Sequence, residues 1–171
     1  LVRLKKLNHN LTSIENVLFS LANTVEAKDQ YTQGHVERVS SMAVMIGKKM
    51  NLSGAELEAL RIGGALHDIG KIGIPGEIIN KEGPLNEDEW NLMKQHPGIG
   101  HKICMPLKRN LGAALNVIRH HHEKLDGSGY PDGLKGSEIS MAARIMTIAD
   151  MFDAMSTDRP YRKAFSTGKV Y

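Results

Sequence analysis

Hydrophobic residues recur at helical spacing along most of the chain. Leucine, isoleucine and valine occupy every third or fourth position of residues 4–28, which predicts one long amphipathic helix there. Similar patterns predict helices over 111–123 and, with Ser140 as N-cap, over 141–157. No segment sustains the alternation of apolar and polar residues that a strand would show. The fold is therefore expected to be all-α, with glycine- and proline-rich joints at 73–84, 97–100 and 126–136.

Two helix starts carry the signature of a capping box, in which a polar N-cap and a glutamate three residues later bond each other's backbone N–H groups. The pairs are Ser53 with Glu56 and Asn86 with Glu89. The first pair predicts a helix over 54–70. The second predicts a helix that ends near His96, because Pro97 disfavours helical geometry in the residue before it.

Composition indicates one soluble globular domain. The chain has 171 residues, of which 41% are hydrophobic and 24% charged, so it can build one core but is too short for two comfortable domains. The single cysteine excludes an intramolecular disulfide and favours a reducing, cytoplasmic location. No apolar run approaches the roughly 20 residues of a membrane span. A net charge of +3 is too small to indicate binding to a nucleic-acid polymer.

The eight histidines are prominent beside three phenylalanines and one tryptophan. Some fall on apolar helix faces: His35 is in phase with Val39, and His67 with Leu60. A single buried histidine or aspartate is more often a hydrogen-bonded core residue than a ligand. Here several ionisable residues are predicted to converge on one core: His35, His67, Asp68, Lys71, His96, Asp150 and Asp153.

The run of three histidines at 120–122 divides by helical phase. His122 lies seven residues after Leu115, and His121 lies three after Ile118, so both are expected to point inward. His120 is expected at the rim. The inward pair joins the other converging groups as candidate metal ligands.

A metal centre would compensate for burying these groups, since buried charges and unsatisfied imidazoles cost several kcal/mol each. Asp68 is placed to bridge two ions. Imidazole and carboxylate ligands without thiolate suit iron, manganese, zinc or nickel. Two ions roughly 3.5 to 4 Å apart would clamp the oxygens of an in-line phosphoryl displacement, so a phosphate ester is the expected substrate. Lys71 and the pair Arg159 and Arg162 are expected to bind the phosphate, although the pair also fits an ordinary solvated helix end.

Five motifs in this order resemble the HD-GYP family of bacterial cyclic-di-GMP phosphodiesterases. They are GHVERV around His35, HDIGKIGIP at 67–75, QHP at 95–97, HHEKLDGSGYP at 121–131 and ADMFDAMSTDRPYR at 149–162. The resemblance runs from about residue 20 to 168 and is specific, because a single HD dipeptide would be weak but five ordered motifs are not. It implies an HD-superfamily helical bundle with a metal centre in its core and a GYP loop at the rim of the site.

The resemblance also implies the activity and the residues that carry it. Cyclic di-GMP would be hydrolysed to pGpG, and possibly to GMP, by in-line attack of a metal-bridging hydroxide. Asp68, Lys71 and Asp153 are the implied catalytic residues, with Asp153 orienting the nucleophile or a ligand. His35, His67, Asp68 and Asp150 would hold one metal, and Asp68, His96, His121 and His122 the other. Lys71, Tyr130, Arg159 and Arg162 would bind the substrate.

Metal number follows from one position. Members that resemble the three-metal type carry a glutamate one helical turn before the first histidine ligand, and this chain has Tyr31 there. Two divalent metal ions are therefore expected, with iron or manganese favoured and zinc or nickel also compatible. The preference between cyclic di-GMP and pGpG is left open.

The resemblance further implies a modular context. Residues 1–28 are expected to connect an upstream sensory or receiver domain to a phosphodiesterase domain at 20–171 that is trimmed at its C-terminus. GGDEF-domain proteins and a homodimer through the N-terminal helix are the expected protein partners. Two alternatives stay open: an HD-type nucleotide phosphohydrolase, and an interaction module that docks onto GGDEF domains.

Overall fold

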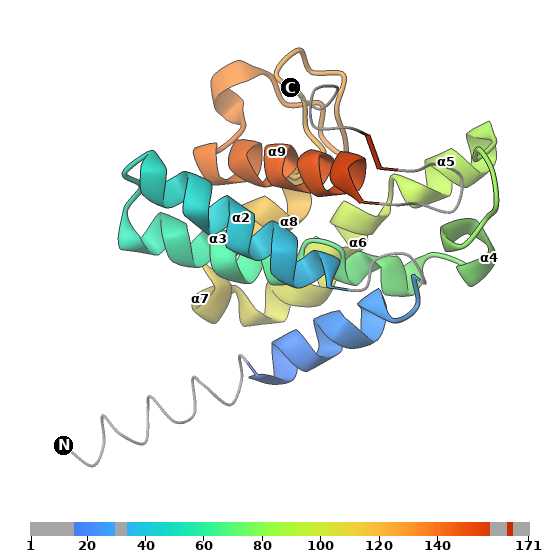
Figure 1. Cartoon of the computed structure of the whole chain (residues 1–171), viewed down its shortest axis with the longest axis horizontal. Coiled ribbons are helices and arrows are strands. Elements are labelled where there is room, and N and C mark those ends of the chain that lie inside the picture. Colours follow the sequence, from blue (N-terminus) through green and yellow to red (C-terminus); the bar gives the residue numbers. More distant parts are fainter. Residues whose placement is uncertain (1–15, 30–33, 158–163, 166–171) are drawn as a thin grey trace.

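The structure, a computed structural model, describes residues 16–29, 34–157 and 164–165 (Figure 1). Within these residues the all-α prediction is confirmed, because the described part contains no strand and only an isolated antiparallel bridge between Asp126 and Lys135. Residues 16–26 are helical. The α-helices that follow are α2 (His35–Lys49), α3 (Gly54–Leu66), α4 (Gly76–Ile79), α5 (Glu87–Met93), α6 (His96–Cys104), α7 (Lys108–Leu111), α8 (Ala114–His120) and α9 (Met141–Ser156). Three 3-10 helices join them: η1 (Ile69–Gly73), η2 (Met105–Leu107) and η3 (Gly136–Glu138).

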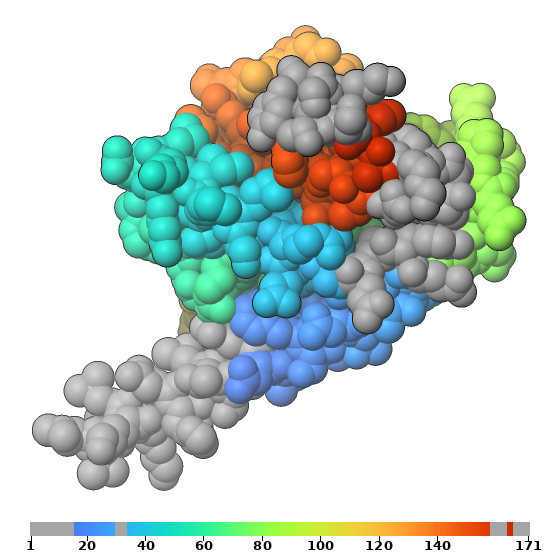
Figure 2. All heavy atoms as spheres, in the orientation of Figure 1, coloured from blue at the N-terminus to red at the C-terminus, as the bar shows by residue number. Residues whose placement is uncertain are grey.

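Two buried clusters hold the helices together. One joins α2, α3, α8 and α9 through residues such as Val39, Leu60 and Met146, all fully buried. The other joins the helix at 16–26 to α3, η1, α6, α7 and α8. Leu18 of that first helix belongs to this second cluster, and Figure 2 shows the helix lying along the surface of the domain beside α2. Residues 16–26, the part of the predicted connecting helix that the structure describes as helical, thus pack onto the domain. The connection to an upstream domain stays a prediction.

The three helix starts predicted from a polar N-cap are confirmed. Ser53 and Asn86 each form a capping box with the predicted glutamate. The side chain of Ser140 accepts a hydrogen bond from the backbone N–H of Ala143 at the start of α9. Local polar signals were therefore enough to locate three helix starts.

The predicted joint at 97–100 is wrong. α5 ends at Met93, and α6 begins at His96 with Pro97 in its first turn. Proline is tolerated there because the N–H groups of a helix's first turn have no intrahelical partner. Two other boundaries also differ, since α3 ends at Leu66 and the predicted helix over 111–123 is confined to α8.

Gly70 determines how closely two site-bearing segments approach. A Cβ atom at this position would lie 1.9 Å from the carbonyl oxygen of His96 and 2.5 Å from the backbone nitrogen of Gly100. Any larger residue would therefore push η1 away from α6. This contact brings the backbone that follows Asp68 directly against the start of α6, where His96 lies.

None of the helices in the described residues is both long and apolar enough to cross a membrane.

Candidate metal centre

Most of the converging side chains lie at or next to helix ends. His35 and His96 are the first residues of α2 and α6, and His67 and His121 directly follow the last residues of α3 and α8. Asp150 comes from the middle of α9. Five segments that are distant in sequence thus deliver ligand-type side chains to one place between the packed helices.

The first triad consists of His35, His67 and Asp150. One ligand atom from each residue lies within 4.8 Å of the other two. The Nε2 atoms of His35 and His67 are 3.3 Å apart, and Nε2 of His35 is 3.4 Å from Oδ1 of Asp150. Both rings are buried. Two imidazoles and one carboxylate therefore point at a common position.

The second triad consists of His96, His121 and His122, and its ligand atoms obey the same 4.8 Å limit. Nε2 of His96 lies 3.2 Å from Nε2 of His121. The rings of His121 and His122 are neighbours, with centroids 4.2 Å apart. His120 points elsewhere: its Nε2 lies 3.0 Å from Oδ2 of Asp132. The structure thus groups His121 and His122 with His96 and places His120 against Asp132, and their division into metal ligands and a rim residue stays a prediction.

Asp68 lies between the triads. Its Oδ2 is 3.4 Å from Nε2 of His67 and 3.9 Å from Nε2 of His35. Its other oxygen, Oδ1, is 3.3 Å from Nε2 of His96. Each carboxylate oxygen therefore faces a different triad, which is the arrangement that a bridging ligand requires.

The tautomers of the histidines can be assigned from their outer nitrogens. Nδ1 of His67, His96 and His121 lies 2.7, 2.8 and 2.9 Å from the backbone carbonyls of Gly64, Met93 and Ile118, respectively. A carbonyl only accepts, so each Nδ1 carries a hydrogen and Nε2 is the nitrogen that points inward. In a neutral ring this Nε2 presents a lone pair. Metal-binding histidines show the same outer hydrogen bond.

The inward nitrogen atoms of the second triad have no hydrogen to share, so a cation would satisfy them. Burial lowers the pKa of His96 to about 4, and burial followed by the neighbouring His122 lowers that of His121 well below its usual range. Both rings are neutral at pH 7, so two lone pairs face each other across 3.2 Å with no hydrogen between them. The residues present therefore fit a metal ion.

The first triad is more strongly anionic. Burial opposes protonation of His67, but the carboxylates of Asp68 and Asp150 outweigh it and raise the pKa of the ring to about 9. Burial likewise opposes ionisation of Asp68, but Lys71 and then His67 hold its pKa well below the ordinary value. This half of the centre attracts a positive charge, which a divalent ion supplies better than a proton.

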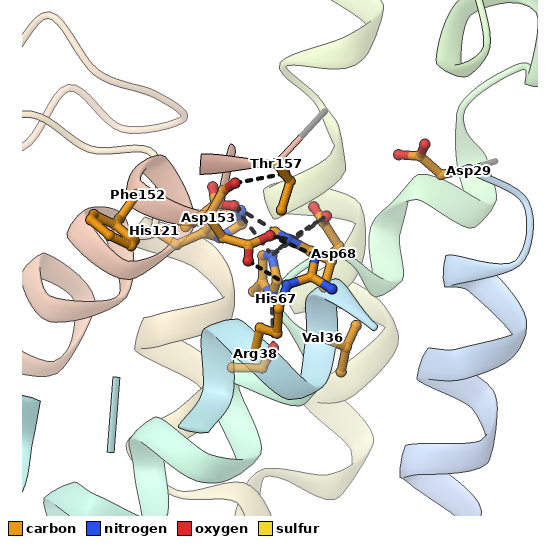
Figure 3. Close-up of polar contacts among 12 residues, drawn as sticks. Asp29, Val36, Arg38, His67, Asp68, His121, Phe152, Asp153 and Thr157 are labelled. Carbon is orange, nitrogen blue, oxygen red and sulfur yellow. Dashed lines mark hydrogen bonds and ion pairs between the residues drawn. The ribbon is translucent and has the colours of Figure 1, made fainter. Parts of the chain in front are cut away.

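Asp153 contacts the outer nitrogen of His35, on the side of the ring away from His67. Figure 3 shows its side chain beside that of Arg38. The outer Nδ1 of His35 donates to Oδ2 of Asp153 over 2.7 Å. Arg38 grips the same carboxylate through Nε at 2.6 Å and Nη2 at 3.0 Å. Burial opposes ionisation of Asp153, yet His35 and Arg38 lower its pKa to about 2. Of the two predicted roles, this geometry favours orientation of a ligand.

Lys71 borders the first triad. Its Nζ lies 2.7 Å from Oδ2 of Asp68 and 3.2 Å from Oδ2 of Asp29. Burial opposes the charge, but Asp68 and then Asp29 raise the pKa of Lys71, so the ammonium is permanent. Lys28 donates through Nζ to the carbonyls of Lys71, Ile72 and Ile74. Residues 28 and 29 thus fix both the backbone and the side chain of this segment, a role that helical phase did not reveal.

The GYP loop closes the centre on the side of the second triad. The ring of Tyr130 stacks on His122 with centroids 4.8 Å apart and planes 30° apart. Burial raises the pKa of Tyr130, so its hydroxyl stays neutral. Gly129 is required for the turn, because a Cβ there would lie 2.4 Å from the backbone nitrogen of Lys124.

Glu123 anchors the loop and was not predicted as functional. Its carboxylate is 2% exposed and accepts three backbone hydrogen bonds. Oε1 accepts from Asp132 at 2.7 Å and Gly133 at 3.1 Å, and Oε2 accepts from Leu134 at 3.0 Å. The sequence held one sign of this role, because Glu123 directly follows two predicted ligands and belongs to the same loop motif.

A cleft with a volume of about 630 Å³ gives access to the centre. Its inner end is bordered by charged and ligand-type residues, namely Asp68, Lys71, His96, His122 and Asp150. Five of the seven predicted metal ligands line this cleft: His35, Asp68, His96, His122 and Asp150. The other two, His67 and His121, are fully buried and complete the two triads. Arg159, Arg162 and Tyr31, on which the phosphate grip and the two-metal expectation depend, lie outside the described residues.

Comparison with known families gives the centre its context. The model of a family described as HD domain matches residues 20–169. The chain belongs to the HD domain family. The HD residues of the family name are His67 and Asp68 in the HDIGKIGIP motif, at the middle of the centre. The predicted family resemblance is confirmed.

Several curated relatives are similar over most of this chain. It is 41% identical to the cyclic di-GMP phosphodiesterase response regulator RpfG of Xanthomonas campestris, over 87% of this chain and 40% of that protein. It is also 41% identical to the 3'3'-cGAMP-specific phosphodiesterase 3 of Vibrio cholerae, over 92% of this chain and 34% of that protein. A cyclic di-GMP phosphodiesterase of Thermotoga maritima is 40% identical, over 88% and 42%. The chain thus spans less than half the length of these relatives.

Two solved structures share the fold at 20% sequence identity. The cyclic GMP-AMP specific phosphodiesterase V-cGAP3 of Vibrio cholerae superposes with a TM-score of 0.66, over 85% of this chain and 41% of that chain. Bd1817, an HDG"Y"P protein from Bdellovibrio bacteriovorus, superposes with a TM-score of 0.68, over 90% and 55%. The expected HD-superfamily bundle is confirmed.

Proposed function

We propose that this protein is a metal-dependent phosphodiesterase that hydrolyses cyclic di-GMP. The observation that carries the proposal is Asp68, whose two oxygens face two separate triads of ligand-type side chains. A shared carboxylate of this kind suits a pair of ions that act on one phosphoryl group. The names of the relatives from Xanthomonas campestris and Thermotoga maritima favour cyclic di-GMP as the substrate.

Two divalent ions would supply Lewis acidity and an activated water for displacement at phosphorus. One would be held by His35, His67 and Asp150, the other by His96, His121 and His122, with Asp68 shared. Iron or manganese are the proposed metals, with zinc or nickel as compatible replacements.

The chain's own side chains have distinct tasks in this proposal. The permanent ammonium of Lys71, at the inner end of the cleft, offsets negative charge that develops on the phosphoryl oxygens. Asp153 is a positioning residue that fixes the His35 ring through its outer nitrogen. The neutral hydroxyl and ring of Tyr130 form one wall of the substrate site. Arg159 and Arg162 are proposed to grip the substrate phosphates.

The test is a turnover assay. Metal-loaded protein is incubated with cyclic di-GMP, pGpG and a panel of nucleoside mono- and triphosphates, and the products are separated by chromatography. Conversion of cyclic di-GMP to pGpG, and onward to GMP, is the expected result. Turnover of the simple nucleotides alone would refute the proposal and favour an HD-type nucleotide phosphohydrolase.

The same assay should also include 3'3'-cGAMP as a second substrate. The Vibrio cholerae relative named as 3'3'-cGAMP-specific is as similar to this chain as the Xanthomonas relative, at 41% identity. Both substrates are cyclic dinucleotides with two phosphodiester bonds, and they differ in one purine base. The ratio of kcat/KM for the two compounds decides between them, and we expect it to favour cyclic di-GMP.

The remaining expectations concern the cellular setting. Docking of GGDEF-domain proteins, a homodimer through the N-terminal helix and a cytoplasmic location stay predictions. Val17 and Leu21 on the helix at 16–26 are 59% and 49% exposed, which supports an additional contact along that helix. Light scattering of the protein at increasing concentration tests the dimer.

A further inference from the structure

The cleft extends well beyond the metal centre, and its outer part differs in chemistry. The inner end carries the charged groups Asp68, Lys71 and Asp150. The outer part is lined by the apolar side chains Ile78, Ile79, Pro84, Leu85 and Met93 together with Trp90. Figure 1 shows α4 and α5, which carry most of these residues, at one end of the molecule. A ligand that fills the whole cleft therefore combines a group that binds Lys71 or the metal centre with a flat or apolar one.

Trp90 is the most conspicuous of the outer residues. It is the only tryptophan of the chain, and its side chain is 45% exposed within the described structure. Tryptophan is usually highly buried, so this much exposure on a short helix leaves a large apolar surface in water. Its location in the cleft suggests that a ligand covers it.

Aromatic rings lead from the second triad to Trp90. Tyr130 stacks on His122 with centroids 4.8 Å apart. Tyr130 then meets Trp90 with centroids 6.1 Å apart and planes at 82°. Two nearly perpendicular rings form a corner, in which a planar group can lie flat on one ring with its edge against the other.

We propose that Trp90 stacks on a purine base of the substrate while a phosphodiester of the same molecule lies at the metal centre. This inference rests on the proposed function, because a cyclic dinucleotide carries bases and phosphates on one compact ring. Stacking on an aromatic side chain tolerates either purine, so Trp90 contributes affinity for the base without choosing guanine over adenine.

The intrinsic fluorescence of Trp90 reports on this contact directly, since the chain has no other tryptophan. Two competing ligands make a matched pair: GMP carries a base, and ribose 5-phosphate has the same sugar and phosphate without one. We expect GMP to quench the emission and ribose 5-phosphate to leave it unchanged. Equal effects of the two ligands, or no effect of GMP, would overturn the proposal.

Kinetics provide the second readout. Trp90→Ala should raise KM for cyclic di-GMP roughly tenfold, equivalent to about 1.4 kcal/mol, and change kcat little, because the base lies away from the reacting bond. Trp90→Phe should restore most of the affinity. Leu92→Ala is the control, because Leu92 lies on the same helix, is 40% exposed and does not line the cleft.

The outcomes separate this inference from the proposed function. If the wild-type protein turns over cyclic di-GMP but Trp90→Ala has an unchanged KM, only the stacking role is wrong. If the wild-type protein does not turn over cyclic dinucleotides at all, the proposed function is wrong, and the comparison of GMP with ribose 5-phosphate still decides whether a base binds. Circular dichroism of Trp90→Ala checks that the fold is intact.

Discussion

Glu123 offers a quantitative test of how the GYP loop is held in place. Its buried carboxylate is the acceptor for the backbone N–H groups of Asp132, Gly133 and Leu134. Glu123→Gln keeps the shape of the side chain but replaces one oxygen with an NH2 group. An NH2 group donates and cannot accept, so the three N–H groups can no longer all be satisfied.

The magnitude follows from the geometry. The best orientation of the glutamine keeps its oxygen on Asp132 and Gly133 and turns the NH2 group toward the N–H of Leu134. One buried donor then lacks an acceptor, which costs about 1–3 kcal/mol, and the two remaining bonds lose the benefit of a charged acceptor. The expected loss of stability is about 2–4 kcal/mol.

Urea denaturation measures the global effect, and hydrogen exchange measures the local one at the same three amides. Glu138→Gln is the matched control, because Glu138 is exposed and accepts one backbone bond, from Lys135 over 2.7 Å. That variant should lose less than about 0.5 kcal/mol. If both variants unfold at the wild-type urea concentration, and exchange at residues 132–134 is unchanged, the anchoring role of Glu123 is refuted.

Three further predictions concern other positions. Asp153→Asn should weaken metal binding about 10- to 100-fold, measured by titration with a chelator, because His35 loses its orienting carboxylate. His120→Ala should leave the metal content unchanged in elemental analysis, whereas His121→Ala should reduce it. Cys104 is 2% exposed, and burial raises its pKa to about 11, so its thiol stays protonated and unreactive toward a thiol reagent from pH 7 to 9 until urea unfolds the protein. Rapid labelling of the native protein would contradict that burial.

Local patterns were sufficient for much of the fold. Capping boxes need only two residues three apart, so Ser53 and Asn86 could be recognised from the sequence. Helical phase also selected His121 over His120, because an apolar face identifies the buried side of a helix. The joint predicted at 97–100 was wrong because proline has two effects: it disfavours helical geometry in the residue before it, and it also suits the first turn of a new helix, as Pro97 does in α6.

Other site residues depend on contacts that no local pattern encodes. Asp29 reaches Lys71 across 42 positions, and Arg38 reaches Asp153 across 115. Both pairs require the packed fold before they exist. From the sequence, Arg38 could equally be an ordinary charged residue on an exposed helix face. Its side chain is indeed 42% exposed, although it pairs with Asp153. The sequence therefore indicated which ligand-type side chains lie together, but it did not reveal Asp29 and Arg38, which contact the residues of the centre.

Asp68 is proposed to join two metal sites that together hold all the metal of one chain. The most direct measurement is the metal-to-protein ratio of anaerobically purified protein, determined by elemental analysis for the wild type and Asp68→Ala side by side. We predict two ions per chain in the wild type, and less than one in a variant that keeps the wild-type circular dichroism spectrum. A wild-type ratio of one or three, or two ions retained without Asp68, would contradict the claim.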